Sequence, residues 1–286
     1  MEKLSNISNI KSILSRHGFT FSKSLGQNFL INPSVCPKMA LESGAAAGKG
    51  AIEIGPGIGV LTCELARLAD KVVAVELDKR LLPVLDETLA EFDNVKIVNG
   101  DAMKIDFNKL INDEFGNIPV SICANLPYYI TSPIIMRLLE SKLPVSSITV
   151  MVQKEAAQRI CAKPGTRQSS SITVAVNYYA EPEMLFGVSS GSFMPAPKVD
   201  SAIIRLNIRK TPPVDVKDER IFFKTVQAAF AQRRKTLSNS LSSGLGLEKS
   251  KIIDILNSIN IPANSRAEQL TVEQFAAVSN ALLTDI

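Results

Sequence analysis

The sequence has no tryptophan and only one histidine, His17, among its 286 residues. Hydrolysis by a Ser-His-Asp or Cys-His arrangement needs a histidine beside the nucleophile, and no nucleophile motif adjoins His17. The cysteines lie far apart and form no Cys-x-x-Cys pair, so we expect no metal site and reduced, mostly buried thiols of a cytosolic protein. They are Cys36, Cys63, Cys123 and Cys161.

Long apolar runs are also absent. No stretch reaches the roughly 20 apolar residues that a membrane-spanning helix needs, and the first residues show no apolar core followed by a cleavage site. We therefore expect a cytoplasmic protein with no membrane partner. The net charge of +4 is weak evidence for a nucleic-acid partner, because many solvated surfaces are mildly basic.

Short apolar runs alternate with segments of helical periodicity in the first half of the chain. The runs predict five strands, at residues 51–54, 72–76, 95–99, 120–125 and 147–152. Strands that alternate with helices favour an α/β fold with a mainly parallel, doubly wound sheet. Three further segments alternate enough to add antiparallel strands to this sheet, at residues 173–178, 184–188 and 202–208.

The segment Lys210-Thr211-Pro212-Pro213 is the best candidate for a linker. We therefore predict two domains, residues 1–210 with the sheet and an N-terminal helical extension, and a smaller domain at residues 211–286. The pattern of the second part is entirely helical, at residues 218–241, 249–259 and 271–283.

A glycine-rich turn, with Gly55, Gly57 and Gly59, lies between the first strand and a helix. Glycines allow a ligand to approach the backbone closely, and a helix N-terminus offers free N–H groups. A dinucleotide site of the G-x-G-x-x-G type would need a glycine where the chain has Val60. S-adenosylmethionine has no phosphate, so the turn favours this cofactor over NAD, with a plain glycine-rich turn as a third interpretation.

Acidic residues lie within or after each of the first three strands. A carboxylate at Glu53 would repel a pyrophosphate and suits the cationic S-adenosylmethionine. Glu76 can accept hydrogen bonds from both ribose hydroxyls, and Asp101 can accept one from an adenine amino group. Because ligands of open α/β sheets bind at the carboxyl ends of the strands, we predict a cofactor site that includes Glu53, Gly55, Gly57, Glu76 and Asp101.

The fourth strand ends in Asn125-Leu126-Pro127-Tyr128. Pro127 disfavours a helical conformation at Leu126 and removes one N–H, which leaves the local carbonyl groups free to accept. An amide oxygen and a carbonyl can each accept a hydrogen bond from a planar exocyclic amino group, and a tyrosine ring can stack on the base that carries it. We interpret this tetrapeptide as a clamp for an adenine amino group.

The motifs together resemble the small-subunit rRNA adenine-N6 dimethyltransferases, the KsgA family. They occur in the order seen in that family and extend the resemblance from about residue 22 to the end of the chain. The matching segments are Gly26-Gln27-Asn28-Phe29-Leu30, residues 53–59, Glu76, Gly100-Asp101, residues 125–128, the segment from Phe193 to Ser201 that is similar to Phe-x-Pro-x-Pro-x-Val-x-Ser, and the basic segment at residues 230–237.

The resemblance implies a Rossmann-like class I methyltransferase domain with a smaller all-helical C-terminal domain. It also implies transfer of two methyl groups from S-adenosylmethionine to each of two adjacent adenosines in the hairpin loop near the 3′ end of small-subunit rRNA. The implied cofactor contacts are Asn28, Leu30, Gly55, Glu76, Asp101 and Asn125. The implied catalytic residues are Asn125, Leu126 and Tyr128, with Phe193 stacking on the other face of the adenine.

Basic residues near the predicted site are candidates for phosphate contacts, which would make RNA affinity fall with salt. We predict such contacts for Lys23, Lys198, Arg233, Arg234 and Lys235, and place the last three on a helix of the second domain. The expected partner is small-subunit rRNA or a precursor of the small ribosomal subunit, bound by a monomer without a metal ion.

Two other functions remain open. A DNA adenine-N6 methyltransferase uses a similar Asn/Asp-Pro-Pro-Tyr clamp, but Leu126 replaces the first of its prolines and no target-recognition insertion is evident. A non-catalytic ribosome-assembly factor could keep the fold without methyl transfer, although the intact clamp and acidic residues argue against that function.

Overall fold

The computed structural model describes residues 4, 6–19, 28–232 and 234–283. The chain divides into two compact units, Met1–Ala157 with Glu183–Ile208, and Gln158–Pro182 with Arg209–Ile286. The second unit therefore takes in Gln158–Pro182, which the predicted division at residue 210 assigns to the first domain.

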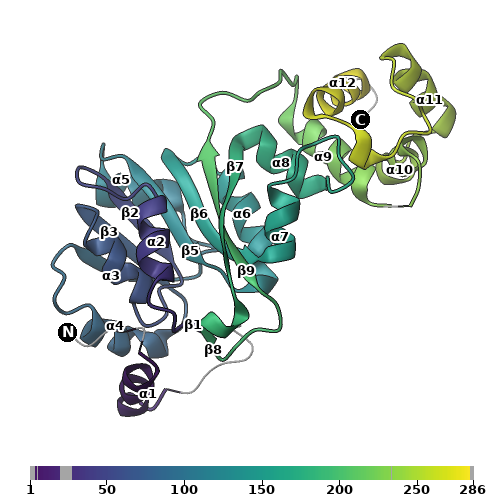
Figure 1. Ribbon diagram of the computed structural model, residues 1–286. Coiled ribbons are helices and arrows are strands. Elements are labelled where there is room, and N and C mark those ends of the chain that lie inside the picture. The colour runs from purple at the N-terminus through teal and green to yellow at the C-terminus, as the bar shows by residue number, and fades with distance from the viewer. Residues whose placement is uncertain (1–3, 5, 20–27, 233, 284–286) are drawn as a thin grey trace. The chain divides into compact units, whose positions relative to one another are not determined.

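The first unit is organised around a seven-stranded sheet with the order β4-β3-β2-β5-β6-β9-β7 (Figure 1). Neighbouring strands from β4 to β6 are parallel, whereas β9 runs antiparallel to β6. This order and direction confirm the predicted mainly parallel, doubly wound sheet with antiparallel strands at one edge. The strands are β2 (Gly50–Ile54), β3 (Lys71–Glu76), β4 (Val95–Asn99), β5 (Val120–Asn125), β6 (Val145–Gln153), β7 (Ala180–Val188) and β9 (Ser201–Ile208).

Both faces of the central strands are covered. One face packs against α2 and α3 through alternate residues such as Ala51, Val72 and Cys123, and the intervening Ile52 and Val73 are also fully buried. Strands buried on both faces read as continuous apolar runs, which is why they were visible in the sequence. The helices of this unit are α1 (Ile7–Arg16), α2 (Val35–Glu42), α3 (Val60–Ala66), α4 (Leu82–Thr88), α5 (Phe107–Phe115), α6 (Thr131–Glu140) and α7 (Lys154–Ile160), which continues into the second unit.

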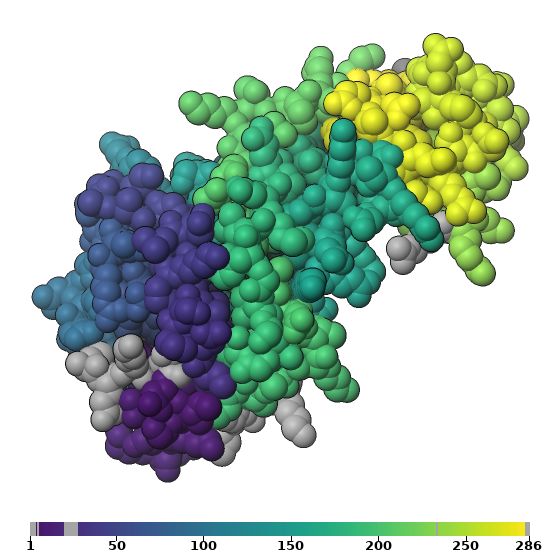
Figure 2. Space-filling view, viewed as in Figure 1, coloured from purple at the N-terminus to yellow at the C-terminus, as the bar shows by residue number. Residues whose placement is uncertain are grey.

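Helix α2 and the antiparallel edge of the sheet lie side by side on one surface, purple and green in Figure 2. The ammonium of Lys38 lies 4.2 Å from the centre of the Phe186 ring, and Arg205 of β9 pairs with Glu42 at 3.3 Å. These contacts join a helix near the N-terminus to strands more than 140 residues later in the chain.

One predicted strand is wrong: residues 173–178 belong to helix α8 (Ser171–Tyr179). The backbone N–H of Ser170 donates to Thr173 Oγ1 at 3.0 Å, an N-terminal cap that begins a helix rather than a strand. Val174 and Tyr178, one helical turn apart, are both buried in the core of the second unit. A short run rich in β-branched residues fits either periodicity, and here the packing partners of these two side chains decide for the helix.

The second unit is helical, as predicted, but residues 218–241 form two helices instead of one. Gly244 of the second helix packs so closely on Ala228 of the first that an added Cβ would lie 2.6 Å from the Ala228 Cβ. The chain must reverse between the two helices to allow this contact. These two helices are α9 (Glu219–Phe230) and α10 (Leu237–Leu245), and α11 (Lys249–Ser258) and α12 (Val272–Leu282) follow them. In the described ranges, none of the protein's helices is long and apolar enough to cross a membrane.

Candidate active site

A cavity lies at the carboxyl edge of the parallel strands in the first unit. The register aligns Ile54 of β2 with Val75 of β3 and with Ala124 of β5, so that the loops after these strands emerge together. Every predicted catalytic and cofactor-binding residue lines this cavity. They are Asn28, Leu30, Glu53, Gly55, Gly57, Glu76, Asp101, Asn125, Leu126, Tyr128 and Phe193.

A short pair of strands brings two distant motifs to the cavity. β1 (Phe29–Leu30) is antiparallel to β8 (Phe193–Met194), with Leu30 opposite Phe193. The N–H of Ile31 donates to the Ser192 carbonyl at 2.9 Å and extends this pairing. Residues from the N-terminal motif and from the motif that contains Phe193 therefore form one wall.

The glycine turn follows β2 as predicted. Gly57 has φ +61°, and a Cβ at this position would lie 3.2 Å from Cε1 of the Phe29 ring. Gly59 also has a left-handed backbone and caps the N-terminus of α3. The turn therefore needs glycine both for its conformation and for its close approach to the cavity wall, which leaves the backbone accessible to a ligand.

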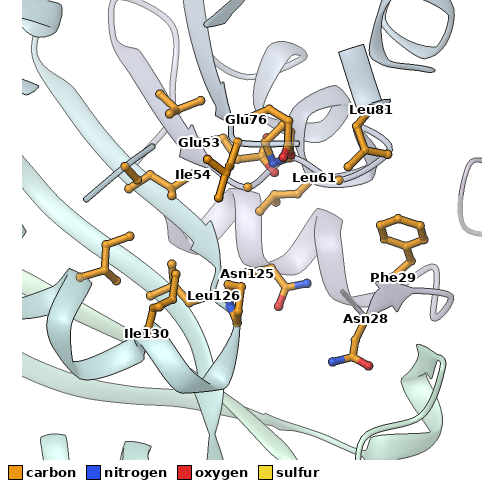
Figure 3. A pocket seen from close by; sticks show the side chains of 18 of the residues that line it. Asn28, Phe29, Glu53, Ile54, Leu61, Glu76, Leu81, Asn125, Leu126 and Ile130 are labelled. Atoms are coloured by element: carbon orange, nitrogen blue, oxygen red, sulfur yellow. The ribbon is translucent and has the colours of Figure 1, made fainter. Parts of the chain in front are cut away.

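Glu53 is buried beneath this turn. Its side chain is 1 % exposed, and its Oε2 atom has no hydrogen-bond partner among the described residues. Burial raises the pKa of Glu53 to about 8, the neighbouring Thr62 hydroxyl acts to lower it, and the nearby Glu76 acts in the same direction as burial. Figure 3 shows both carboxylates on the same side of the cavity, with Asn125 across from them. An unsatisfied buried carboxyl oxygen is costly and indicates a place where a ligand donor completes the site.

Glu76 and Asp101 are each partly engaged by their own loops. Glu76 Oε1 accepts from the N–H of Asp78 at 2.6 Å, and burial raises the pKa of Glu76 to about 7. Asp101 Oδ1 accepts from the N–H of Met103 at 2.8 Å. These bonds fix the direction of each carboxylate at the end of its strand; the backbone N–H groups of Gly57 and Leu77 also donate to Glu76, and Asp101 Oδ2 lies 3.9 Å from the Lys104 ammonium.

The charge of the cavity selects its ligand. Three carboxylic acids line it, and the described lining includes no lysine, arginine or histidine. The pKa values of Glu53 and Glu76 are raised to about 8 and 7, and a neighbouring ammonium or sulfonium group would favour their ionised forms, whereas a pyrophosphate would raise both pKa values further. The residues therefore fit S-adenosylmethionine. No group of three or more His, Cys, Asp or Glu residues that could hold a metal ion occurs in the part of the chain that the structure describes.

The tetrapeptide after β5 lies at the mouth of the cavity. Leu126 is 2 % exposed, which holds the backbone of the segment in place. Pro127 has φ −55° and ψ 133°, so the chain is extended there and a single 3₁₀ turn, Tyr128–Ile130, follows. The Tyr128 hydroxyl and Ser201 Oγ are 2.8 Å apart, a hydrogen bond that ties the turn to the start of β9.

Phe193 is only 4 % exposed and packs with the core residues beneath α2, while also lining the cavity. Its ring is therefore held by the fold at the edge of the site. Whether it stacks on a target base stays a prediction.

Three of the five predicted RNA-contact residues lie in the described part of the chain. Lys198 is exposed in the segment between β8 and β9. Arg234 and Lys235 are exposed, but they lie in the connection between α9 and α10, so their predicted place on a helix is wrong. Chain reversal between the two packed helices is the reason. Lys23 and Arg233 lie outside the described residues.

The sequence alone did not indicate that Ala102, Met103 and Tyr129 line the cavity, or that Ser201 contacts Tyr128. Ser201 belongs to a motif that was recognised, but its bond to Tyr128 joins residues 73 positions apart. Ala102 and Met103 line the cavity directly after Asp101, and their position after a strand end was the available signal. Tyr129 lines the cavity as well and remains largely exposed.

The chain is similar to known proteins over nearly its whole length. The family model described as ribosomal RNA adenine dimethylase matches residues 18–283. The chain is 51 % identical over 277 residues to ribosomal RNA small subunit methyltransferase A of Geobacillus thermodenitrificans, covering 96 % of this chain and 94 % of the relative. It is 47 % identical to the protein of the same name from Alkaliphilus oremlandii, covering 99 % of each.

Solved structures share the fold. A dimethyladenosine transferase from Plasmodium falciparum aligns with a TM-score of 0.74 at 24 % identity, over 90 % of this chain and 98 % of that one. The 23S rRNA methyltransferase ErmE aligns with a TM-score of 0.67 at 26 % identity, over 89 % of this chain and 99 % of that one. The family match over nearly the whole chain confirms the resemblance seen in the motifs, and the chain belongs to the ribosomal RNA adenine dimethylase family.

Proposed function

We propose that this protein transfers methyl groups from S-adenosylmethionine to the N6 atoms of two adjacent adenosines in the 3′-terminal hairpin loop of small-subunit (16S) rRNA, two to each. The observation that carries the proposal is the joining of an acidic, cation-selective cavity to the Asn125–Tyr128 clamp in one site. The names of the relatives support the same activity.

Glu53, Glu76 and Asp101 would hold the cofactor, which supplies an electrophilic methyl group on its sulfonium. Glu53 offers the unpartnered Oε2 to a cationic group, and Glu76 and Asp101 offer oxygens to hydroxyl and amino donors. The glycine turn, with Asn28 and Leu30 from the opposite wall, would complete the binding surface.

The clamp would activate the adenine. The lone pair of an adenine N6 atom is delocalised into the ring, so this atom is a poor nucleophile. If Asn125 Oδ1 and the Leu126 carbonyl accept its two hydrogens, the nitrogen turns its lone pair toward the methyl group. Such positioning can contribute about 7–11 kcal/mol. The methylated nitrogen can release its proton to water, which agrees with a described cavity lining that contains no histidine or lysine.

A target base must leave its stack to reach the cavity, and a loop adenosine costs less to extract than a paired one. Tyr128 and Phe193 would replace the lost stacking, at about 1–3 kcal/mol per base. The hydrogen bond between the Tyr128 and Ser201 hydroxyls would hold the tyrosine ring in one position before the base arrives.

Exposed basic residues would hold the RNA backbone. Lys198 near the cavity, and Arg234 and Lys235 in the second unit, are the described candidates, and Lys23 and Arg233 complete the predicted set. We propose a monomer that acts in the cytoplasm on a precursor of the small ribosomal subunit during its biogenesis.

One experiment separates this function from its alternatives. The protein is incubated with radiolabelled S-adenosylmethionine and, in parallel, with unmethylated small ribosomal subunits, naked small-subunit rRNA and duplex DNA, and labelled nucleosides are then identified. We expect N6,N6-dimethyladenosine from small subunits or their rRNA. Label in DNA alone would instead indicate a DNA methyltransferase, and binding to subunits without transfer would indicate an assembly factor.

A further inference from the structure

Tyr129 is an exposed aromatic residue at the rim of the cavity. It lines the cavity, yet 60 % of its surface is exposed. Among the residues that the structure describes, its ring packs against no other aromatic ring and its hydroxyl has no hydrogen-bond partner. Its position is thus not explained by packing of the protein itself.

The backbone that carries Tyr129 is well anchored. The N–H of Ile130 donates to the Pro127 carbonyl at 3.1 Å, and the turn continues directly into α6. Successive residues of a 3₁₀ turn point about 120° apart, so Tyr128 and Tyr129 project in different directions from one rigid turn. Tyr128 is directed to Ser201 and the clamp, and Tyr129 is directed to solvent at the cavity mouth.

We propose that Tyr129 is a stacking platform for the nucleotide next to the target adenosine in the RNA strand. This inference rests on the proposed function, because it takes a single-stranded RNA loop as the ligand. When one adenosine enters the cavity, its neighbour loses a stacking partner and emerges beside the clamp. An exposed phenol ring on a fixed backbone offers a flat apolar surface at that place without ordering a flexible loop.

The platform gives the site a way to hold two adjacent adenosines. While one occupies the clamp, the other is retained on Tyr129 and stays close for the next transfer. Tyr129 is then a positioning residue: it contacts the RNA beside the reacting base and acts through the placement of the strand. Its loss should raise KM for RNA much more than it lowers kcat.

The test uses a short RNA hairpin with two adjacent unpaired adenosines in its loop, and two derivatives in which the base on the 5′ or the 3′ side of one adenosine is removed. Tyr129→Ala and Tyr129→Leu should each raise KM for the intact hairpin by about 5- to 150-fold, the loss of one base stack. Tyr129→Phe, which keeps the ring, should restore what these variants lose. Met184→Ala, at an exposed apolar residue of β7, serves as the matched control.

Removal of the stacked base should weaken binding to the wild-type protein by the same factor and leave no further effect for Tyr129→Ala. A fluorescent 2-aminopurine at the neighbouring position reports this stacking by quenching on binding, with or without methyl transfer. Independent, multiplying effects of Tyr129→Ala and both base removals would overturn the inference, as would unchanged quenching in Tyr129→Ala. Absence of methyl transfer by the wild-type protein would instead count against the proposed function, while the quenching measurement would still decide the role of Tyr129.

Discussion

Replacing Glu53 by glutamine tests the electrostatics of the cavity directly. The folded protein raises the pKa of this buried carboxyl from its ordinary value of 4.5 to about 8. A group whose folded pKa is raised binds its proton more tightly in the native state, so the native state is favoured below pH 4.5 and this advantage is lost as the pH rises to 8. Each unit of pH in that window costs about 1.4 kcal/mol, so stability should fall by about 3 kcal/mol between pH 5 and pH 7 from Glu53 alone.

Glutamine has nearly the same shape and does not titrate, so the Glu53→Gln variant should lack this loss. The free energy of unfolding is measured by urea titration, followed by far-ultraviolet circular dichroism, at pH 5, 6 and 7 without cofactor. The difference between wild type and variant should shift by about 3 kcal/mol in favour of the variant across the series. The pKa of Glu76 is raised as well, but Glu76 is present in both proteins, so its contribution to the pH dependence largely cancels when the two free energies of unfolding are subtracted.

Glu140→Gln, at an exposed residue near the end of α6, is the matched control and should follow the wild-type profile. Saturating S-adenosylmethionine should remove much of the pH dependence of wild type, because a cationic group beside Glu53 stabilises the ionised carboxylate. If the free energies of unfolding of wild type and Glu53→Gln instead change in parallel from pH 5 to pH 7, Glu53 is not held protonated in the free protein. The proposal that Glu53 becomes ionised when a cationic ligand binds would then be wrong.

Three further predictions concern the clamp, the glycine turn and the basic segment. Asn125→Ala should bind S-adenosylmethionine within a few-fold of wild type but have a kcat about 10²–10³-fold lower, because one acceptor aimed at the reacting group is removed. Equilibrium dialysis measures the cofactor affinity and single-turnover methylation measures the rate. Near-normal turnover would exclude the clamp. Gly57→Ala should lower the free energy of unfolding by about 1–2 kcal/mol, because alanine must adopt φ +61° and its Cβ lies too close to Phe29. The variant should also bind the cofactor more weakly. An unchanged melting temperature would contradict the predicted strain. The double replacement of Arg234 and Lys235 by glutamate should weaken RNA binding and reduce the magnitude of the slope of log K against log salt concentration by about 2. Filter binding from low to high salt measures this slope. A slope equal to that of wild type would show that neither residue contacts RNA phosphates.

Local sequence pattern is enough to specify the central part of this fold. The strands β2, β3, β5 and β6 are mostly apolar runs because both of their faces are buried, and such runs are recognisable without any knowledge of their neighbours. The residues at their carboxyl ends follow from chain order: parallel strands bring Glu76, Asp101 and Asn125 to one edge whatever the details of the loops. The family resemblance rested on these same local motifs.

Tertiary structure decided what local pattern leaves open. Residues 173–178 could form a strand or a helix, and burial of Val174 and Tyr178 in a helical core chose the helix. Arg234 and Lys235 lie in a turn because α10 folds back onto α9. The pairing of Leu30 with Phe193 joins segments about 160 residues apart, which no periodicity can indicate.

The properties of individual site residues also depend on the tertiary structure. The unpartnered oxygen and raised pKa of Glu53, the bond from Tyr128 to Ser201 and the exposure of Tyr129 each depend on which atoms surround a side chain in space. A sequence specifies which chemical groups are available and the period at which they recur. Desolvation and hydrogen bonding act over a few ångströms between residues distant in the chain, so only the folded structure could assign them.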